Sequence, residues 1–323
     1  MNSMNSILII GDSLSYNSYD YDVKPFGASC ECFADIHSWS YALRNEIIMS
    51  TKGFTYGADM KKSHVSLENR VFGELSFCGT ESENFIYPHV CSTITLYLQK
   101  HPFGGEYKVT VDDGYSVCDV GFKGESDKNH GCELFCITLP ADETKGFHKV
   151  EFSGSGIYTV LGMSKEEKMV TISGKGSQKA SFFLGNYDEY IGCYEFDTIA
   201  IIVGANDIRQ TQHREFEEAY NALIERIYFQ NPRAQIIMML PTNMENTENP
   251  ELDEGSYTSK DTAGAYCDII KRVAENYNCV VFDTWQIFDE IPTYVWRYDN
   301  VHMTRLGNDI LHKKFIEFLK VPK

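Results

Sequence analysis

The chain has 323 residues and carries 46 acidic against 29 basic side chains, so its formal net charge is −17. This length favours one to three domains, and 43% hydrophobic with 23% charged residues excludes wholesale disorder. The acidic balance argues against binding to nucleic acid or to an anionic membrane, because phosphate contacts need clustered Lys and Arg. The longest apolar runs are strand-sized and too short to cross a bilayer.

The ten cysteines show no strong metal-binding or disulfide pattern. No Cys-x-x-Cys pair occurs, and Cys30-x-Cys32 lacks a matched second pair. The N-terminus has no basic segment ahead of its first apolar run, so a standard signal peptide is not expected. We therefore expect reduced, mostly buried thiols in a cytoplasmic protein without a bound metal.

The first half of the chain changes texture near residue 60. An apolar run at residues 7–10 predicts a strand, and the tripeptide GDS follows it directly at residues 11–13. A helix is expected at residues 39–49, with Ser38 as its N-cap. Residues 60–165 consist of short alternating segments broken by Gly, Pro, Asp and Asn, which is typical of an antiparallel β-sandwich.

From about residue 168 strand-like and helix-like segments alternate, which predicts a doubly wound parallel sheet. The near-continuous apolar runs are typical of parallel strands covered on both faces. These runs lie at residues 169–173, 196–204, 234–240 and 278–284, and the expected helices at 214–230, 259–275 and 304–319, the last with Thr304 as N-cap. The expected architecture is an α/β domain, residues 1–58 and 168–323, interrupted by a β-sandwich at residues 60–165.

Three short motifs follow predicted strands, at the edge where parallel sheets bind ligands. Ser13 in the first motif becomes a nucleophile only if a base takes its proton. Asn206, in Gly-Ala-Asn-Asp, can direct an amide N–H at a developing oxyanion. His302 is the expected base, and Asp299 can reach round a turn to hold its Nδ1–H. Each of the three motifs, taken singly, is also typical of an ordinary loop.

In this order the motifs resemble those of the SGNH/GDSL hydrolases. GDS matches the first block, GAND the Gly-x-Asn-Asp block and DNVH the Asp-x-x-His block of that family. The resemblance covers both parts of the predicted α/β domain and implies a flavodoxin-like sheet. It also implies that Ser13 is the nucleophile, His302 the base and Asp299 its orienting acid. The Asn206 amide and the Ser13 backbone N–H are then expected in the oxyanion hole.

The remaining block of the family is a glycine whose backbone N–H completes the oxyanion hole, and several glycines compete for this role. Family members usually place it one helix ahead of the strand that precedes the Asn. Gly174 precedes Asn206 by enough residues for a turn, a helix and a strand, whereas the whole β-sandwich follows Gly57. We expect Gly174 to fill this role, with Gly176 as the second choice and Gly57 as the third. The alternative is that these glycines only form a flexible loop.

The resemblance implies an acyl-enzyme on Ser13 that needs no metal or organic cofactor. Family members deacylate small esters, lipids or O-acetylated glycans, and a carbohydrate-binding-type β-sandwich recurs among the sugar acetylesterases. We therefore expect a serine esterase that removes O-acetyl groups from acetylated oligosaccharides. An O-acetyltransferase with the same acyl-enzyme, a general small-ester or lipid esterase, and a catalytically silent binding protein remain open.

Two further features keep two interpretations each. Trp296, three residues before Asp299, either lines the acyl or sugar pocket or packs in the core. The adjacent Asp112 and Asp113 either hold a structural Ca²⁺ or simply form a hairpin turn. The sequence also leaves a homo-oligomer open.

Overall fold

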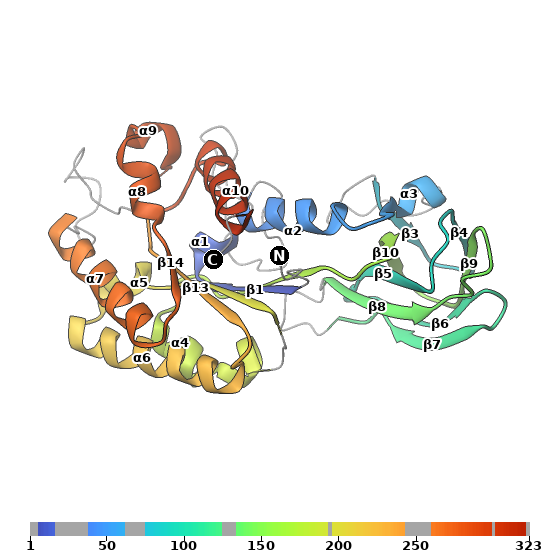
Figure 1. The fold of residues 1–323 in the computed structure, drawn as a ribbon, viewed down its shortest axis with the longest axis horizontal. Helices are drawn as coiled ribbons and strands as arrows, with labels where there is room; N and C mark the ends of the chain where they lie inside the picture. Colours follow the sequence, from blue (N-terminus) through green and yellow to red (C-terminus); the bar gives the residue numbers. More distant parts are fainter. Residues whose placement is uncertain are drawn as a thin grey trace. The chain divides into compact units, whose positions relative to one another are not determined.

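The computed structural model describes residues 6–16, 38–61, 75–124, 134–192, 196–242, 260–298 and 301–320. The chain divides into two compact units (Figure 1). The α/β unit contains the described residues up to Arg44 and those from Val170 onward, and the β unit contains those of Asn45–Met169.

The α/β unit is built on a five-stranded sheet with the strand order β11-β1-β12-β13-β14. The pairs β1/β12, β12/β13 and β13/β14 are parallel. Their apolar side chains are buried, as expected for strands covered on both faces. The strands are β1 (Ser6–Gly11), β11 (Met169–Gly174), β12 (Thr198–Ile202), β13 (Gln235–Met239) and β14 (Val280–Phe282). The predicted parallel sheet, including its N-terminal strand, is thus confirmed.

Helices cover both faces of this sheet, with α4, α6 and α7 on one face and α8 and α10 on the other (Figure 1). The longer helices are α2 (Trp39–Met49), α6 (His213–Gln230), α7 (Lys260–Asn276) and α10 (Arg305–Lys320). The shorter ones are α1 (Ser13–Tyr16), α4 (Ala180–Gly185), α5 (Ala205–Gln210), α8 (Thr284–Asp289), α9 (Thr293–Trp296) and a π-helical turn η3 (Asp188–Gly192).

Both predicted N-caps are confirmed. Ser38 Oγ accepts a hydrogen bond from Tyr41 N at 3.3 Å at the start of α2. Thr304 Oγ1 accepts one from Gly307 N at 3.1 Å at the start of α10. The two helix starts are also joined, because Trp39 N donates to Asn308 Oδ1 at 2.9 Å. Each bond satisfies an N–H that the first helical turn leaves without an intrahelical partner.

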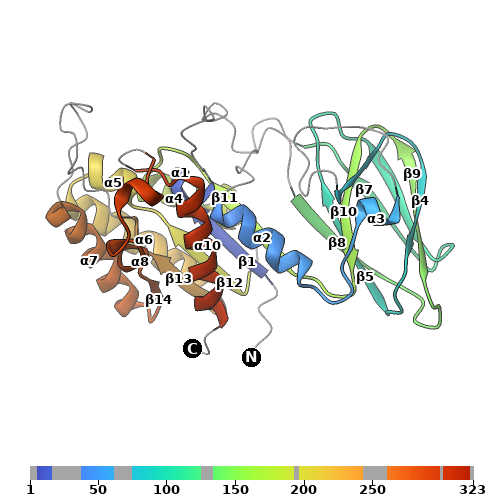
Figure 2. The ribbon, with the colours of Figure 1, turned by 90° about the horizontal axis from the view of Figure 1, so that it is seen from above.

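The β unit contains two antiparallel sheets (Figure 2). One has the order β2-β10-β5-β8, with β3 also paired to β10, and the other has the order β4-β9-β6-β7. Buried side chains from both sheets form one hydrophobic core, with Phe85 and Phe152 from one sheet and Leu96 and Tyr158 from the other. The strands are β2 (Thr55–Tyr56), β3 (Phe77–Gly79), β4 (Glu83–Tyr87), β5 (Thr93–Gln99), β6 (Glu106–Val111), β7 (Ser116–Gly121), β8 (Leu134–Pro140), β9 (His148–Ser155) and β10 (Tyr158–Ser164).

The division between the units differs from the predicted boundary near residues 58–60. The short strand β2 pairs with β10 through Thr55 and Tyr56, and α3 (Gly57–Met60) follows it directly. This segment therefore belongs to the β unit. Two residues of strand carry too little periodicity to be recognised in a sequence.

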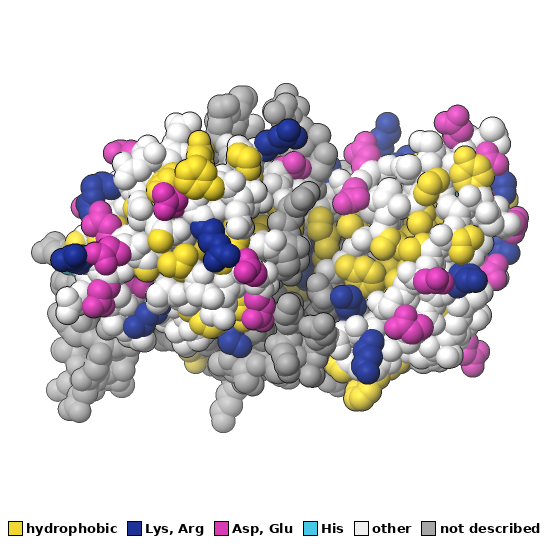
Figure 3. Space-filling model, turned by 90° about the horizontal axis from the view of Figure 1, so that it is seen from below, with side chains coloured by type: hydrophobic (Ala, Val, Ile, Leu, Met, Phe, Trp, Pro, Cys, Tyr) yellow, Lys and Arg dark blue, Asp and Glu magenta, His cyan; other side chains and the backbone are white. Residues whose placement is uncertain are grey.

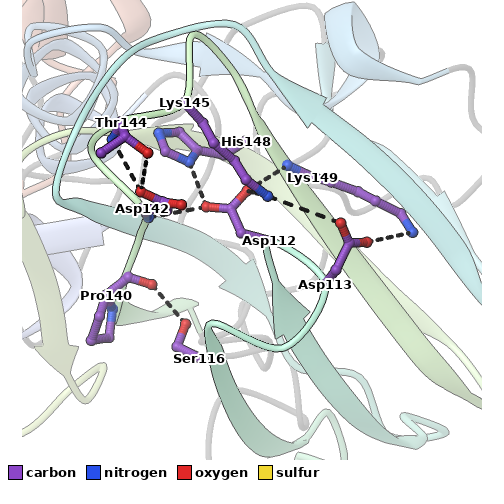
Figure 4. A network of polar contacts seen from close by, with 9 residues as sticks. All are labelled: Asp112, Asp113, Ser116, Pro140, Asp142, Thr144, Lys145, His148 and Lys149. Atoms are coloured by element: carbon purple, nitrogen blue, oxygen red, sulfur yellow. Dashed lines mark hydrogen bonds and ion pairs between the residues drawn. The ribbon is translucent and has the colours of Figure 1, made fainter.

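Asp112 and Asp113 form a turn whose polar partners are nitrogen donors (Figure 4). Asp112 Oδ2 accepts from His148 Nδ1 at 2.7 Å and from Asp142 N at 3.1 Å. Asp113 pairs with Lys149 at 3.4 Å. Burial raises the pKa of Asp112, but these hydrogen bonds outweigh it and hold that pKa below its usual value. Of the two interpretations, the structure favours the turn.

Three wider properties concern only the described residues. None of their helices is both long and apolar enough to cross a membrane. Their six cysteines are free thiols, and they include no group of three or more His, Cys, Asp or Glu side chains that could hold a metal ion. On the face drawn in Figure 3, Lys and Arg side chains are interspersed with Asp and Glu.

Two helical glycines allow a matched test of packing in the α/β unit. A Cβ at Gly307 in α10 would lie 2.3 Å from Trp296 O, whereas one at Gly264 in α7 would meet nothing within 4 Å. We predict that Gly307→Ala lowers the free energy of unfolding by about 1–3 kcal/mol, because backbone must move. Gly264→Ala should raise it by about 0.5–1 kcal/mol. Urea unfolding measures both, and equal stabilities would contradict the close approach at Gly307.

Candidate active site

Ser13 is the first residue of α1 and directly follows the tight turn at Asp12 that ends β1. Gly11 ends the strand, and a Cβ there would come within 2.7 Å of side-chain atoms of β12 and of Ser15. Asp12 Oδ1 accepts from Leu14 N at 2.9 Å, and Asp12 O accepts from Ser15 N at 3.0 Å. These bonds use the N–H groups of Leu14 and Ser15 and do not involve that of Ser13, which the resemblance assigns to the oxyanion hole.

His302 projects from a short loop that is closed at its base. Arg297 and Met303 form an antiparallel bridge across the loop, and Tyr298 N donates to His302 O at 2.9 Å. This loop places His302 Nε2 3.0 Å from Ser13 Oγ, within hydrogen-bond distance. The structure thus brings together the predicted nucleophile and the predicted base from opposite ends of the chain.

Asn206 follows β12 in the first turn of α5. The turn passes through Gly204, whose φ of 133° is rarely adopted by other residues. Asn206 Nδ2 donates to Asp12 Oδ2 and to Gln178 O, each at 3.0 Å. Asn206 is therefore joined to the residue before Ser13, but both its N–H groups already have acceptors. An oxyanion role requires one of these bonds to be exchanged.

The other predicted site residues have different outcomes. Asp299 lies outside the described residues, so its role stays a prediction. Gly174 ends β11 beside β1, where the next residue, Lys175, donates its N–H to Gly11 O at 3.0 Å. Gly176 lies in the turn that follows. The choice of Gly174 for the oxyanion hole, with Gly176 second, also stays a prediction.

Gly57, the third choice for the oxyanion glycine, has a packing role in the β unit. It begins α3, and a Cβ there would lie 2.1 Å from Val160 O in β10. Its lack of a side chain is therefore explained without reference to catalysis.

Part of the chain matches the model of a known enzyme family. Residues 160–310 match the GDSL-like Lipase/Acylhydrolase family. This range contains Asn206 and His302 but not Ser13. Every strand of the α/β sheet except β1 lies within the matched residues, so the α/β unit resembles the SGNH/GDSL hydrolases, a family of carboxylic ester hydrolases. A search of curated proteins gave no significant match.

Solved structures with a similar fold include several esterases. An acetylxylan esterase from Geobacillus stearothermophilus is 20% identical, with a TM-score of 0.41, over 49% of this chain and 74% of that one. The acetyl xylan esterase AlAXEase is 18% identical, with a TM-score of 0.41, over 47% and 81% of the two chains. A peptidoglycan O-acetylesterase is 12% identical, with a TM-score of 0.51, over 98% and 91%. This last likeness shows a shared fold along nearly the whole of both chains.

Asp207 holds the segment of the α/β unit that follows the predicted oxyanion glycines. Its Oδ2 accepts from Ala180 N at 3.0 Å at the start of α4. Asn206 binds Gln178 O in the same segment. Two adjacent residues after β12 thus hold residues 178–180. Sequence reasoning gave Asp207 no role beyond the motif, although its place beside Asn206 was the available signal.

Burial dominates the electrostatics of Asp12 and Asp207. It raises the pKa of Asp12 to about 7, against the opposing effects of the Leu14 N–H and of His302. It also raises the pKa of Asp207 to about 6, against the hydrogen bond from Ala180. Sequence reasoning also missed Asp12, whose titration falls near neutral pH within the site.

Of the two interpretations of Trp296, the structure favours packing in the core over contact with the substrate. Its side chain is 1% exposed and stacks on Phe288 with ring centroids 4.4 Å apart. Its Nε1 donates to Ile291 O at 3.2 Å. The structure therefore places Trp296 in the core of the α/β unit, where its backbone O accepts a hydrogen bond from Thr304 N at 2.8 Å, and the predicted substrate contact is wrong.

The raised pKa of Asp12 predicts a loss of stability with rising pH. The carboxyl holds its proton up to about pH 7 in the native state but only to about 3.9 when unfolded, so the native state binds more protons between these values. Between pH 5 and pH 8 this group should lower the free energy of unfolding by on the order of 2–3 kcal/mol.

Urea unfolding of the wild type and of Asp12→Asn at both pH values measures this loss. Between pH 5 and pH 8 the free energy of unfolding of the variant should fall by on the order of 2–3 kcal/mol less than that of the wild type. The altered hydrogen bonds of the variant change its stability equally at both pH values, so they do not affect this difference. Asp207, whose pKa is also raised, is present in both proteins, so its own desolvation contributes equally to both losses. Equal losses in the two proteins would contradict the raised pKa of Asp12.

Proposed function

We propose that the chain is a serine O-acetylesterase that removes acetyl groups from acetylated oligosaccharides. The observation that most supports this proposal is the 3.0 Å distance between Ser13 Oγ and His302 Nε2. A neutral histidine at this distance can take the serine proton as the hydroxyl attacks an ester carbonyl. The carboxyl edge of a parallel sheet is also where such folds bind their ligands.

The reaction proceeds through an acyl-enzyme. Ser13 Oγ bonds to the acetyl carbon while its proton moves to His302 Nε2, and Asp299 stabilises the resulting imidazolium. The N–H groups of Ser13 and Gly174 and the amide of Asn206 stabilise the tetrahedral oxyanion. His302 then protonates the departing sugar oxygen, and the ester bond to the sugar breaks. Water, deprotonated by His302, attacks the acetyl-serine and releases acetate.

Asn206 enters this reaction through an exchange of hydrogen bonds. Its bond to Asp12 holds the amide beside the nucleophile, and its second N–H donates to Gln178 O in the free enzyme. In the tetrahedral intermediate this second N–H turns from Gln178 O to the oxyanion. Charge on the oxyanion makes the new bond stronger than the one it replaces, so the exchange favours the transition state.

Two observations support a glycan ester as the substrate. The full-length likeness to a peptidoglycan O-acetylesterase indicates that this combination of folds occurs in an enzyme named for sugar deacetylation. The net charge of −17 disfavours anionic lipid surfaces. We further propose that the β unit is an inserted β-sandwich of carbohydrate-binding type, and that the α/β unit on either side of it in the sequence is the catalytic domain.

Acetate release from acetylated xylo- and manno-oligosaccharides tests the proposal. The wild type should release acetate, and Ser13→Ala and His302→Ala should each lower kcat by at least about 10³-fold, because nucleophile and base act as a unit. Ser50→Ala, which changes an exposed serine at the end of α2, is the matched control and should retain activity.

Circular dichroism establishes that the variants remain folded. A folded Ser13→Ala variant with wild-type acetate release would overturn the assignment of the nucleophile. Hydrolysis of lipid esters without any release from oligosaccharides would overturn the assignment of the substrate.

A further inference from the structure

A groove in the α/β unit lies apart from the Ser13–His302 pair. It has a volume of about 320 Å³, within the usual range for sites of small ligands. Its walls come from α7 and α8, and Leu240, directly after β13, also lines it. Asp283 contacts both walls. Its Oδ1 caps α8 by accepting a hydrogen bond from Gln286 N at 2.9 Å. Its Oδ2 lies 3.6 Å from Lys271 Nζ on α7.

Trp285 supplies an aromatic surface in this groove. The other two tryptophans of the chain, Trp39 and Trp296, are 0% and 1% exposed, whereas Trp285 is half-buried and lines the groove. A half-exposed indole presents an apolar face together with a polar N–H. This combination suits the apolar C–H face of a sugar ring, whose hydroxyls stay free for hydrogen bonds at the rim.

The polar groups of the groove select against an anionic ligand. Asp268, Asp283 and Asp289 line it, with Lys271 as the cation that faces them. Three carboxylates against one ammonium repel phosphates and uronic acids. Carboxylates accept hydrogen bonds from neighbouring hydroxyls, and the Gln286 amide both donates and accepts. The ligand of matching chemistry is an uncharged polyhydroxylated ring.

The groove has free space and lies on the same edge of the sheet as the nucleophile. Gly264 lines it from α7, and a Cβ there would meet no atom within 4 Å. The strands β13 and β14, at whose carboxyl ends the groove lies, are second and third from β1 in the sheet. Strand spacing places these ends roughly 10–15 Å from that of β1, a distance that a short glycan can bridge.

We propose that this groove is a subsite for an uncharged sugar unit of the substrate glycan, with Trp285 as the stacking platform. This inference rests on the proposed deacetylation of oligosaccharides and narrows its substrate class to neutral glycans. The bound unit positions the chain so that an acetylated unit farther along reaches Ser13. The free energy of binding at this subsite then helps to position the ester at Ser13 and so increases the rate of its hydrolysis.

Tryptophan fluorescence gives a direct binding test that needs no turnover. Unacetylated xylohexaose and mannohexaose are the neutral probes, and an oligogalacturonate of the same length is the anionic one. At least one neutral probe should change the emission saturably and shield Trp285 from acrylamide, and the anionic probe should do neither. Asp268→Ala keeps the reporter indole and should raise the Kd of the neutral probe several-fold. No change with either neutral probe, or equal binding of the anionic one, would overturn the subsite.

Steady-state kinetics of the full chain gives the second test. Trp285→Ala should lower kcat/KM on an acetylated oligosaccharide about tenfold more than on a small aryl acetate, mainly through KM. Phe229→Ala is the matched control, since this α6 side chain is 70% exposed and does not line the groove. The subsite is overturned if Trp285→Ala behaves as the control does.

The two proposals fail in distinguishable ways. If neutral oligosaccharides shield Trp285 but the wild type releases no acetate from them when acetylated, the proposed function fails and the groove remains a sugar site. If the wild type releases acetate but Trp285→Ala changes neither KM nor binding, the function stands and the subsite fails.

Discussion

The hydrogen bond from Asn206 Nδ2 to the buried Asp12 Oδ2 ties the ends of β1 and β12, and the arrangement of the site depends on it. Neighbouring parallel strands have their carboxyl ends at the same edge of the sheet, but the side chains that follow these strands must still be held in position relative to one another. The bond requires Gly11 to let the strands approach closely and Gly204 to turn the chain into α5. The bond also requires the Asp12 carboxyl group to be buried away from water, and this burial raises its pKa.

Asp12 and Asp112 show how the same side chain responds to two kinds of surroundings. Asp12 is buried beside the edge of a parallel sheet with an amide and a backbone N–H as partners, and desolvation raises its pKa. Asp112 in the β unit has His148 and further N–H donors, and its pKa is lowered. The first acid titrates near neutral pH within the site, whereas the second remains a charged link in a turn.

The sequence predicted the features that repeat or that follow a motif. The parallel strands, the caps Ser38 and Thr304 and the meeting of Ser13 with His302 were all expected, because hydrophobic periodicity, cap chemistry and motif order are local signals. The burial of Trp296 was not predictable from its distance to a motif, since exposure depends on packing against distant residues. The groove with Trp285 was not predicted from the sequence for the same reason, because its walls are two helices that come together only in the folded unit.

Ser13 carries the acyl group in the proposed reaction, and mass spectrometry of the enzyme quenched in acid during turnover tests this step most directly. With an acetylated oligosaccharide in excess, the account predicts one added acetyl group on the peptide that contains Ser13. The label should be absent from the His302→Ala variant under the same conditions. Acetate release at the wild-type rate with the acetyl group on another residue would contradict the account.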